Sequence, residues 1–241
     1  IVGRIVMRMN VRELVEMGYL AKPTFRMVRV VSTKSYSGPD VNEMTRQHLY
    51  YNPRVSKAAG ILVRMFVTKM RRPTVVLIEE LEQFGKLLPH LKGLRVGFAH
   101  GPLNATTKEL VPEDHRATDT SSVVAQFNAG DLDVLVGTSC IATGTDIQVA
   151  EAALYLMGGK SEIKIRQGVG RGTRGGANSR VRNPWTGNQK VDFVHVDFDV
   201  VDTMLSEDEL RSFPPHRHAQ ARAAVYEDIY SRPEYVDMTE I

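Results

Sequence analysis

The segment Val75-Val-Leu-Ile78 is short and wholly apolar, which is typical of a β-strand buried on both faces of a sheet. A helical pattern follows it, and the alternation of apolar strand and helix then continues along the chain. Further strands are predicted at residues 94–98, 133–136, 152–156 and 192–196. Short apolar strands separated by helices predict an α/β fold, with a parallel sheet covered by helices on both faces.

This alternating pattern occupies residues 73–200, which are therefore predicted to form the core of the domain. Residues 1–72 are predicted to be a linker segment with leading helices, and they include a strand at 25–31. Residues 201–241 carry acidic turns and a pair of prolines before a helical pattern, so they are predicted to be a C-terminal helical extension.

The composition of the 241 residues is that of an ordinary globular protein, with 42% hydrophobic residues and a formal net charge of +3. No run approaches the roughly 18 consecutive apolar residues of a membrane span, so no membrane partner is expected. A single cysteine, Cys140, excludes an intrachain disulfide and favours an intracellular setting, whether cytoplasm, nucleoid or nucleus. The chain begins at Ile1 rather than at methionine, and we expect it to be a fragment of a longer protein.

The most unusual segment is Gln167-Gly-Val-Gly-Arg171-Gly-Thr-Arg174, which contains two guanidinium groups and no acidic residue. If the segment is helical, positions 167, 171 and 174 share one face. Such a face presents forked, cationic donors, which suit a polyphosphate whose charge changes during a reaction.

A second polar segment, Thr138-Ser-Cys-Ile-Ala-Thr-Gly144-Thr-Asp146, directly follows the strand predicted at 133–136. Its hydroxyl groups lie at the end of a strand, where they can hold phosphate oxygens of a nucleic-acid backbone without reading its sequence. Gly144 permits a tight turn, and the carboxylate of Asp146 suits ribose hydroxyl groups.

Two familiar nucleotide motifs are matched only in part. Gly170 to Gly175 fits the dinucleotide pattern G-x-G-x-x-G, but the charged residues before it do not form the strand that this motif requires. Gly159-Lys160-Ser161 looks like the end of a phosphate loop, yet that loop requires a glycine where the chain has Leu154. Neither motif therefore predicts a complete nucleotide site.

Together these segments resemble the second RecA-like domain of superfamily-two helicases. Residues 138–146 match motif V of that family in the form T-x-x-x-A-x-G-x-D, and residues 167–174 match every defined position of motif VI, Q-x-x-G-R-x-x-R. The strand at 75–78 corresponds loosely to motif IV, and residues 13–20 resemble the segment that leads in from the first domain. The resemblance covers most of the chain and implies a RecA-like parallel sheet with helices on both faces.

The resemblance further implies that this domain completes an ATP site. Arg171 and Arg174 would be catalytic arginine fingers that neutralise charge on the γ-phosphate in the transition state. The residues expected near the nucleotide or the domain interface are Gln167, Gly144, Asp146 and Gly170.

The resemblance also implies a grip on one nucleic-acid strand through its phosphate backbone, with DNA favoured over RNA. The residues expected to make that contact are Thr138, Ser139, His100 and Gly101. The remaining expected partner is the N-terminal RecA-like domain of the same protein.

The sequence departs from a complete helicase because it has no phosphate loop and no acidic motif for Mg²⁺. We therefore expect ATP and Mg²⁺ to be held mainly by a first RecA-like domain, from sequence before Ile1 or from another chain. The fragment alone should be inactive. Two alternatives stay open: a nucleic-acid-binding module without ATPase coupling, and a dinucleotide-binding oxidoreductase domain.

Overall fold

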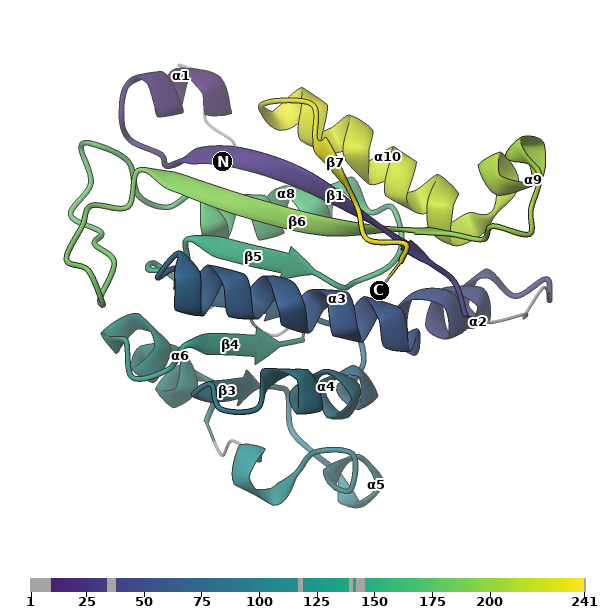
Figure 1. Ribbon diagram of the computed structural model, residues 1–241. Coiled ribbons are helices and arrows are strands. Elements are labelled where there is room, and N and C mark those ends of the chain that lie inside the picture. Colours follow the sequence, from purple (N-terminus) through teal and green to yellow (C-terminus); the bar gives the residue numbers. More distant parts are fainter. Residues whose placement is uncertain (1–9, 34–37, 117–118, 139–140, 142–145, 241) are drawn as a thin grey trace, which may run out of the picture.

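A computed structural model describes residues 10–33, 38–116, 119–138, 141 and 146–240. Within these residues, seven strands form one sheet in the order β3-β4-β2-β5-β6-β1-β7, and every neighbouring pair is parallel (Figure 1). The strands are β1 Lys22–Val31, β2 Thr74–Leu77, β3 Val96–Ala99, β4 Val134–Gly137, β5 Ala152–Tyr155, β6 Asp192–Val201 and β7 Glu234–Asp237. The predicted α/β fold with a parallel sheet is confirmed.

The helices fill the connections between these strands. The α-helices are α1 Val11–Glu16, α2 Val41–Thr45, α3 Pro53–Arg64, α4 Leu81–Leu87, α5 Ala105–Lys108, α6 Thr120–Ala129, α8 Glu162–Gly172, α9 Glu207–Ser212 and α10 Pro214–Ile229. Short π-helical turns, η1 Arg46–Tyr50 and η2 Met65–Lys69, continue α2 and α3, and 3₁₀ turns occur at η3 Leu88–Leu91 and η4 Glu113–His115. No helix among the described residues is both long and apolar enough to cross a membrane.

Helices cover the sheet on both faces, as Figure 1 shows for α3 in front of the strands and α8 behind them. The strand β2 and the residue after it explain the apolar pattern, because their side chains alternate between two cores. Val76 and Ile78 join the core beneath α3, whereas Val75 and Leu77 join the core on the side of α6 and α8. A strand that is buried on both faces has no polar alternation, which is why it appears in the sequence as an unbroken apolar run.

The sheet draws strands from all three regions that the sequence distinguishes. Strand β1 pairs with β6 over its full length, from Lys22 opposite Asp192 to Val31 opposite Val201. The edge strand β7 then pairs with β1 and is mostly exposed. The sequence did not predict β7, since this short segment has neither an apolar run nor a clear alternation.

Helix α10 is attached to the sheet by a buried polar network. Arg222 donates to both carboxylate oxygens of Asp197 on β6, at 2.6 and 2.9 Å, and to the carbonyl of Gly159 at 2.8 Å. The hydroxyl of Tyr226 donates to the same carboxylate at 2.7 Å and lies 3.1 Å from His195 Nε2. Burial lowers the pKa of His195 to about 4, so this ring is neutral at physiological pH.

Candidate functional site

Helix α8 carries much of the predicted motif VI across one face of the sheet. Ser161 caps its amino end, and its buried face includes Ile165 and Val169. A Cβ atom on Gly172 would lie 1.9 Å from the Phe193 ring, so only glycine allows the end of α8 to pack this closely on β6. This close packing fixes the position of the chain just before the last predicted arginine finger.

The outer side of α8 presents Gln167 and Gly170 to solvent, whereas Arg171 is half-buried. Arg171 lines a narrow, mainly apolar pocket together with Ile141 and Ile147, which belong to the segment that follows β4. The side chain of Arg171 therefore lies between α8 and that segment, so residues from both predicted motifs line the same pocket.

Arg174 lies beyond the helix, since α8 ends just before its C-cap residue Thr173. Its backbone instead forms an antiparallel bridge with Leu20, ahead of β1. Gly175 and Gly176 follow with φ of +142° and +106°, a region that favours glycine, and they turn the chain away. Gln167 and Arg171 thus lie on the helix as predicted, but the shared helical face does not extend to Arg174, because α8 ends at Gly172.

The two predicted motifs meet at an ion pair between the Asp146 carboxylate and the Arg174 guanidinium. Both side chains remain accessible, at 57% and 43% of their full exposure. Gln148 Nε2 donates to the other carboxylate oxygen of Asp146 at 2.5 Å. Asn128 of α6 donates to the Asp146 carbonyl at 2.8 Å and accepts from the Gln148 amide at 3.1 Å. The carboxylate that faces Arg174 is therefore held by a fixed backbone.

Lys190 supports the same segment from the interior. Its side chain is fully buried, and its ammonium group donates to the Gln148 carbonyl at 2.8 Å. Burial lowers the pKa of Lys190 to about 7; the carboxylate of Glu151 opposes this shift and the charge of Arg174 adds to it. Sequence reasoning did not identify Lys190, because a single lysine in a polar loop has the pattern of a solvated side chain.

The predicted nucleic-acid contacts lie at the opposite edge of the sheet, where the parallel strands end. Strands β3 and β4 are neighbours with their last residues paired, so His100 and Thr138 follow side by side. His100 is buried, with Nδ1 2.7 Å from the Gly101 carbonyl, and Thr138 is half-buried. The structure thus brings these predicted residues together, whereas Ser139 and Gly144 lie outside the described residues.

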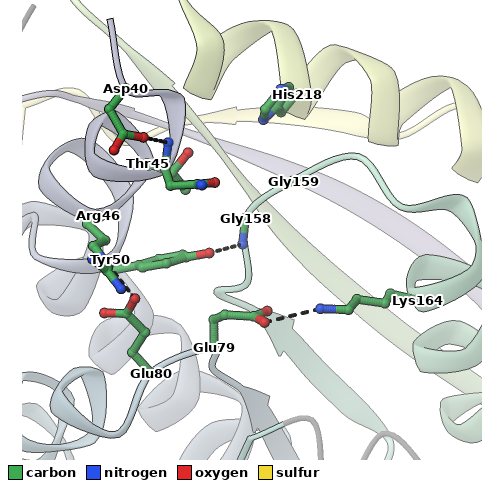
Figure 2. Close-up of a pocket in the computed structure, with 11 residues that line it drawn as sticks. Asp40, Thr45, Arg46, Tyr50, Glu79, Glu80, Gly158, Gly159, Lys164 and His218 are labelled. Carbon is green, nitrogen blue, oxygen red and sulfur yellow. Dashed lines mark hydrogen bonds and ion pairs between the residues drawn. The ribbon is translucent and has the colours of Figure 1, made fainter. Parts of the chain in front are cut away.

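A cavity of about 430 Å³ opens at the same edge, between the ends of β2 and β5 (Figure 2). The hydroxyl of Tyr50 accepts a hydrogen bond from the Gly158 amide at 3.0 Å, and Lys164 pairs with Glu79 at 3.1 Å. His218 of α10 also lines the cavity. Sequence reasoning assigned neither Tyr50 nor His218 to a site, since they lie on helices far apart in the chain.

The described residues do not fit a metal site of their own. They contain no group of three His, Cys, Asp or Glu side chains that could hold an ion. Asp146, the one carboxylate in the predicted nucleotide half-site, is occupied by Arg174 and Gln148. Mg²⁺ therefore has no evident ligand set in this part of the protein.

The family model described as the helicase conserved C-terminal domain matches residues 57–176, which include both predicted motifs. A search of curated proteins gave no match.

Several solved structures share the fold at low sequence identity. The ATP-dependent Type ISP restriction-modification enzyme LlaBIII bound to DNA superimposes with a TM-score of 0.58 at 13% identity, over 97% of this chain and 16% of that chain. T4 UvsW gives a TM-score of 0.58 at 11% identity, over 90% and 42% of the two chains. A fragment described as an HsdR subunit of a type I restriction enzyme from Vibrio vulnificus YJ016 gives 0.57 at 17% identity, over 98% and 40%.

The chain therefore spans less than half the length of each of these three structures. At these identities the likeness shows the fold, and the family match adds what kind of domain the fold represents. Residues 57–176, about half of the chain, therefore belong to the family of helicase conserved C-terminal domains.

Proposed function

We propose that this domain is the C-terminal motor domain of an ATP-dependent nucleic-acid helicase or translocase. The observation that carries the proposal is the Asp146–Arg174 ion pair, which joins the two motifs at an accessible surface. An arginine with 43% of its side chain exposed can meet a ligand that another domain presents. Arg222, which joins α10 to β6, is instead fully enclosed.

In this proposal Arg171 and Arg174 complete an ATP site whose phosphate loop and Mg²⁺ ligands belong mainly to a first RecA-like domain. Transfer of the γ-phosphoryl group depends on positioning and on neutralising charge that spreads over its oxygens. A guanidinium has five N–H donors, so Arg174 can turn some of them to phosphate while Asp146 holds the others. Gln167 and Gly170, exposed on α8, would face the same nucleotide-bearing domain.

The same proposal assigns the carboxyl edge of the sheet to nucleic acid. Thr138 and Ser139, with His100 and Gly101, would contact the phosphate backbone of one strand, with DNA favoured over RNA. The LlaBIII structure, which shares the fold, is bound to DNA. Backbone contacts of this kind predict weak sequence preference and strong dependence on salt. Closure of the two domains on ATP and their reopening after hydrolysis would then move the protein along the strand.

Two other functions remain as competitors. A nucleic-acid-binding module without ATPase coupling would need neither Arg174 nor its support from Asp146. The presence of the Asp146–Arg174 pair therefore favours the ATP-dependent motor function. A dinucleotide-binding oxidoreductase would need its glycines between a strand and a helix. Gly170 and Gly172 lie instead inside the last turn of α8, and this geometry disfavours that alternative.

Replacing Arg174→Ala in the protein that carries both RecA-like domains tests the proposal. Nucleic-acid-stimulated ATP hydrolysis should fall at least about a hundredfold, because an arginine finger lowers the barrier by several kcal/mol. Binding of single-stranded nucleic acid should change little. The matched control is Arg166→Ala, since Arg166 is a surface arginine of α8 that pairs with Glu162 and Asp228. Unchanged hydrolysis in the Arg174 variant would contradict the finger assignment.

A further inference from the structure

We propose that the cavity between the ends of β2 and β5 binds one nucleobase of the nucleic-acid strand, a base that carries an exocyclic amine. This inference rests on the proposed function, because it takes the strand to lie along the carboxyl edge of the sheet. The strand order β3-β4-β2-β5 places the cavity at the same edge of the sheet as Thr138, with the end of β2 between them. Neighbouring strands lie about 4.8 Å apart, so the cavity is only about two strand spacings from the predicted backbone contact.

Two polar groups that line the cavity have unused hydrogen-bonding capacity. The Tyr50 hydroxyl accepts from the Gly158 amide, but its own proton has no acceptor among the described residues. His218 is only 9% exposed, and its Nδ1 atom is buried without a hydrogen-bond partner in the described part of the chain. Figure 2 shows both side chains at the cavity. Buried polar groups almost always find a partner, so the proton of the Tyr50 hydroxyl indicates that a polar ligand completes the site.

The charges around the cavity favour a base over a phosphate. Three carboxylates, Asp40, Glu79 and Glu80, line it against two cations, Arg46 and Lys164. Arg46 is already bonded to Glu80 at 2.5 Å, and Lys164 to one oxygen of Glu79 at 3.1 Å. The second oxygen of Glu79 has no partner among the described residues. A free carboxylate oxygen repels a phosphate but accepts well from the amine of cytosine, adenine or guanine.

The wall of the cavity is rigid where the base would bind. A Cβ atom on Gly158 would lie 2.4 Å from the Thr45 methyl and 2.7 Å from the Tyr50 hydroxyl, so the loop after β5 is packed directly against both. Burial raises the pKa of Tyr50 to about 12, and the phenol therefore keeps its proton as a donor. The cavity thus offers fixed donors and a free acceptor, the mixture that the edge of a base requires, and its volume is that of small-ligand pockets.

The test is an abasic scan with the protein that carries both RecA-like domains. Single-stranded oligonucleotides, each with one abasic site, are titrated in fluorescence anisotropy. For the native protein, one position should lose about tenfold in affinity, since its base makes the hydrogen bonds described above. In the Tyr50→Phe variant, an abasic site at that position should lower the affinity no more than an abasic site elsewhere. The matched control is Tyr19→Phe, because the Tyr19 side chain is exposed and does not line the cavity, and this variant should keep the native profile.

A second variant, and a second pair of oligonucleotides that differ only in cytosine or thymine at the sensitive position, make the test independent of folding effects. Glu79→Ala should remove the preference for cytosine over thymine at the sensitive position, which we expect to be about threefold to tenfold in the native protein. Unfolding temperatures close to the native value show that both variants are folded. If the native protein binds normally and every abasic position has the same affinity, the inference is wrong. If cytosine and thymine bind equally at the sensitive position, the base is not recognised through an exocyclic amine. Failure of the native protein to bind any oligonucleotide would instead refute the proposed function.

Discussion

Two arginine–aspartate pairs in this domain have similar chemistry and opposite surroundings. Arg222 and Asp197 join α10 to β6 with side chains that are 1% and 0% exposed. Arg174 and Asp146 join the two predicted motifs with side chains that are 43% and 57% exposed. The buried pair has neighbours on every side, whereas the accessible pair lies at the surface of the protein.

The difference in burial predicts a division of roles. Removing one partner of a buried pair strands a charge in a low-dielectric interior, which costs several kcal/mol. An accessible pair is solvated in the folded and unfolded states alike and contributes little to stability. The fold should therefore depend on Arg222, and the proposed activity should depend on Arg174. Three measurements can break or sharpen this contrast.

The largest effect on stability is expected for Arg222→Met. The substitution leaves Asp197 buried without its cation and removes the donor to the Gly159 carbonyl. The free energy of unfolding should fall by about 3–5 kcal/mol, measured by urea denaturation of the 241-residue chain. The double variant Asp197→Leu with Arg222→Met should recover part of this loss, because no unpaired charge remains. A loss below about 1 kcal/mol in the single variant would refute a structural role for the pair.

A second, pH-dependent effect is expected from Lys190. Burial lowers its folded-state pKa from 10.5 to about 7, so the unfolded chain binds more protons between these values. Stability contributed by this group therefore rises as pH increases from about 7 to about 10.5, and it is lost as pH falls. Comparing native protein with Lys190→Met by urea denaturation across this range should show the native protein gaining a few kcal/mol relative to the variant. A constant difference would show that Lys190 titrates normally.

The buried pair and Lys190 also show where sequence reasoning stopped. The alternating pattern and two motifs sufficed for the α/β fold, because apolar strands must be buried on both faces wherever the helices lie. Asp197 lies in a strand that was predicted only to residue 196, and Arg222 in a helix with no apolar stripe. Their partnership depends on a packing of α10 against β6 that no local pattern encodes.

The candidate site was predictable to a similar extent. Motif spacing identified Arg174 and Asp146, but their contact depends on Gly175 and Gly176 turning the chain after α8. The cavity at the carboxyl edge was not predicted. Tyr50 reaches it from the turn after α2, which is separated by more than a hundred residues from the Gly158 loop that it bonds.

The smallest stability effect, and the sharpest contrast, is expected for Asp146→Asn. The amide keeps the shape of the side chain and can still bond Gln148, but it loses the charge that holds Arg174. Because both side chains of the pair are accessible, the free energy of unfolding should change by less than about 1 kcal/mol in urea denaturation. In the two-domain protein, stimulated ATP hydrolysis should nevertheless fall several-fold, since Arg174 is no longer held in place before ATP arrives. A stability loss as large as that of Arg222→Met would show that accessibility does not separate the two pairs, and the contrast between them would fail.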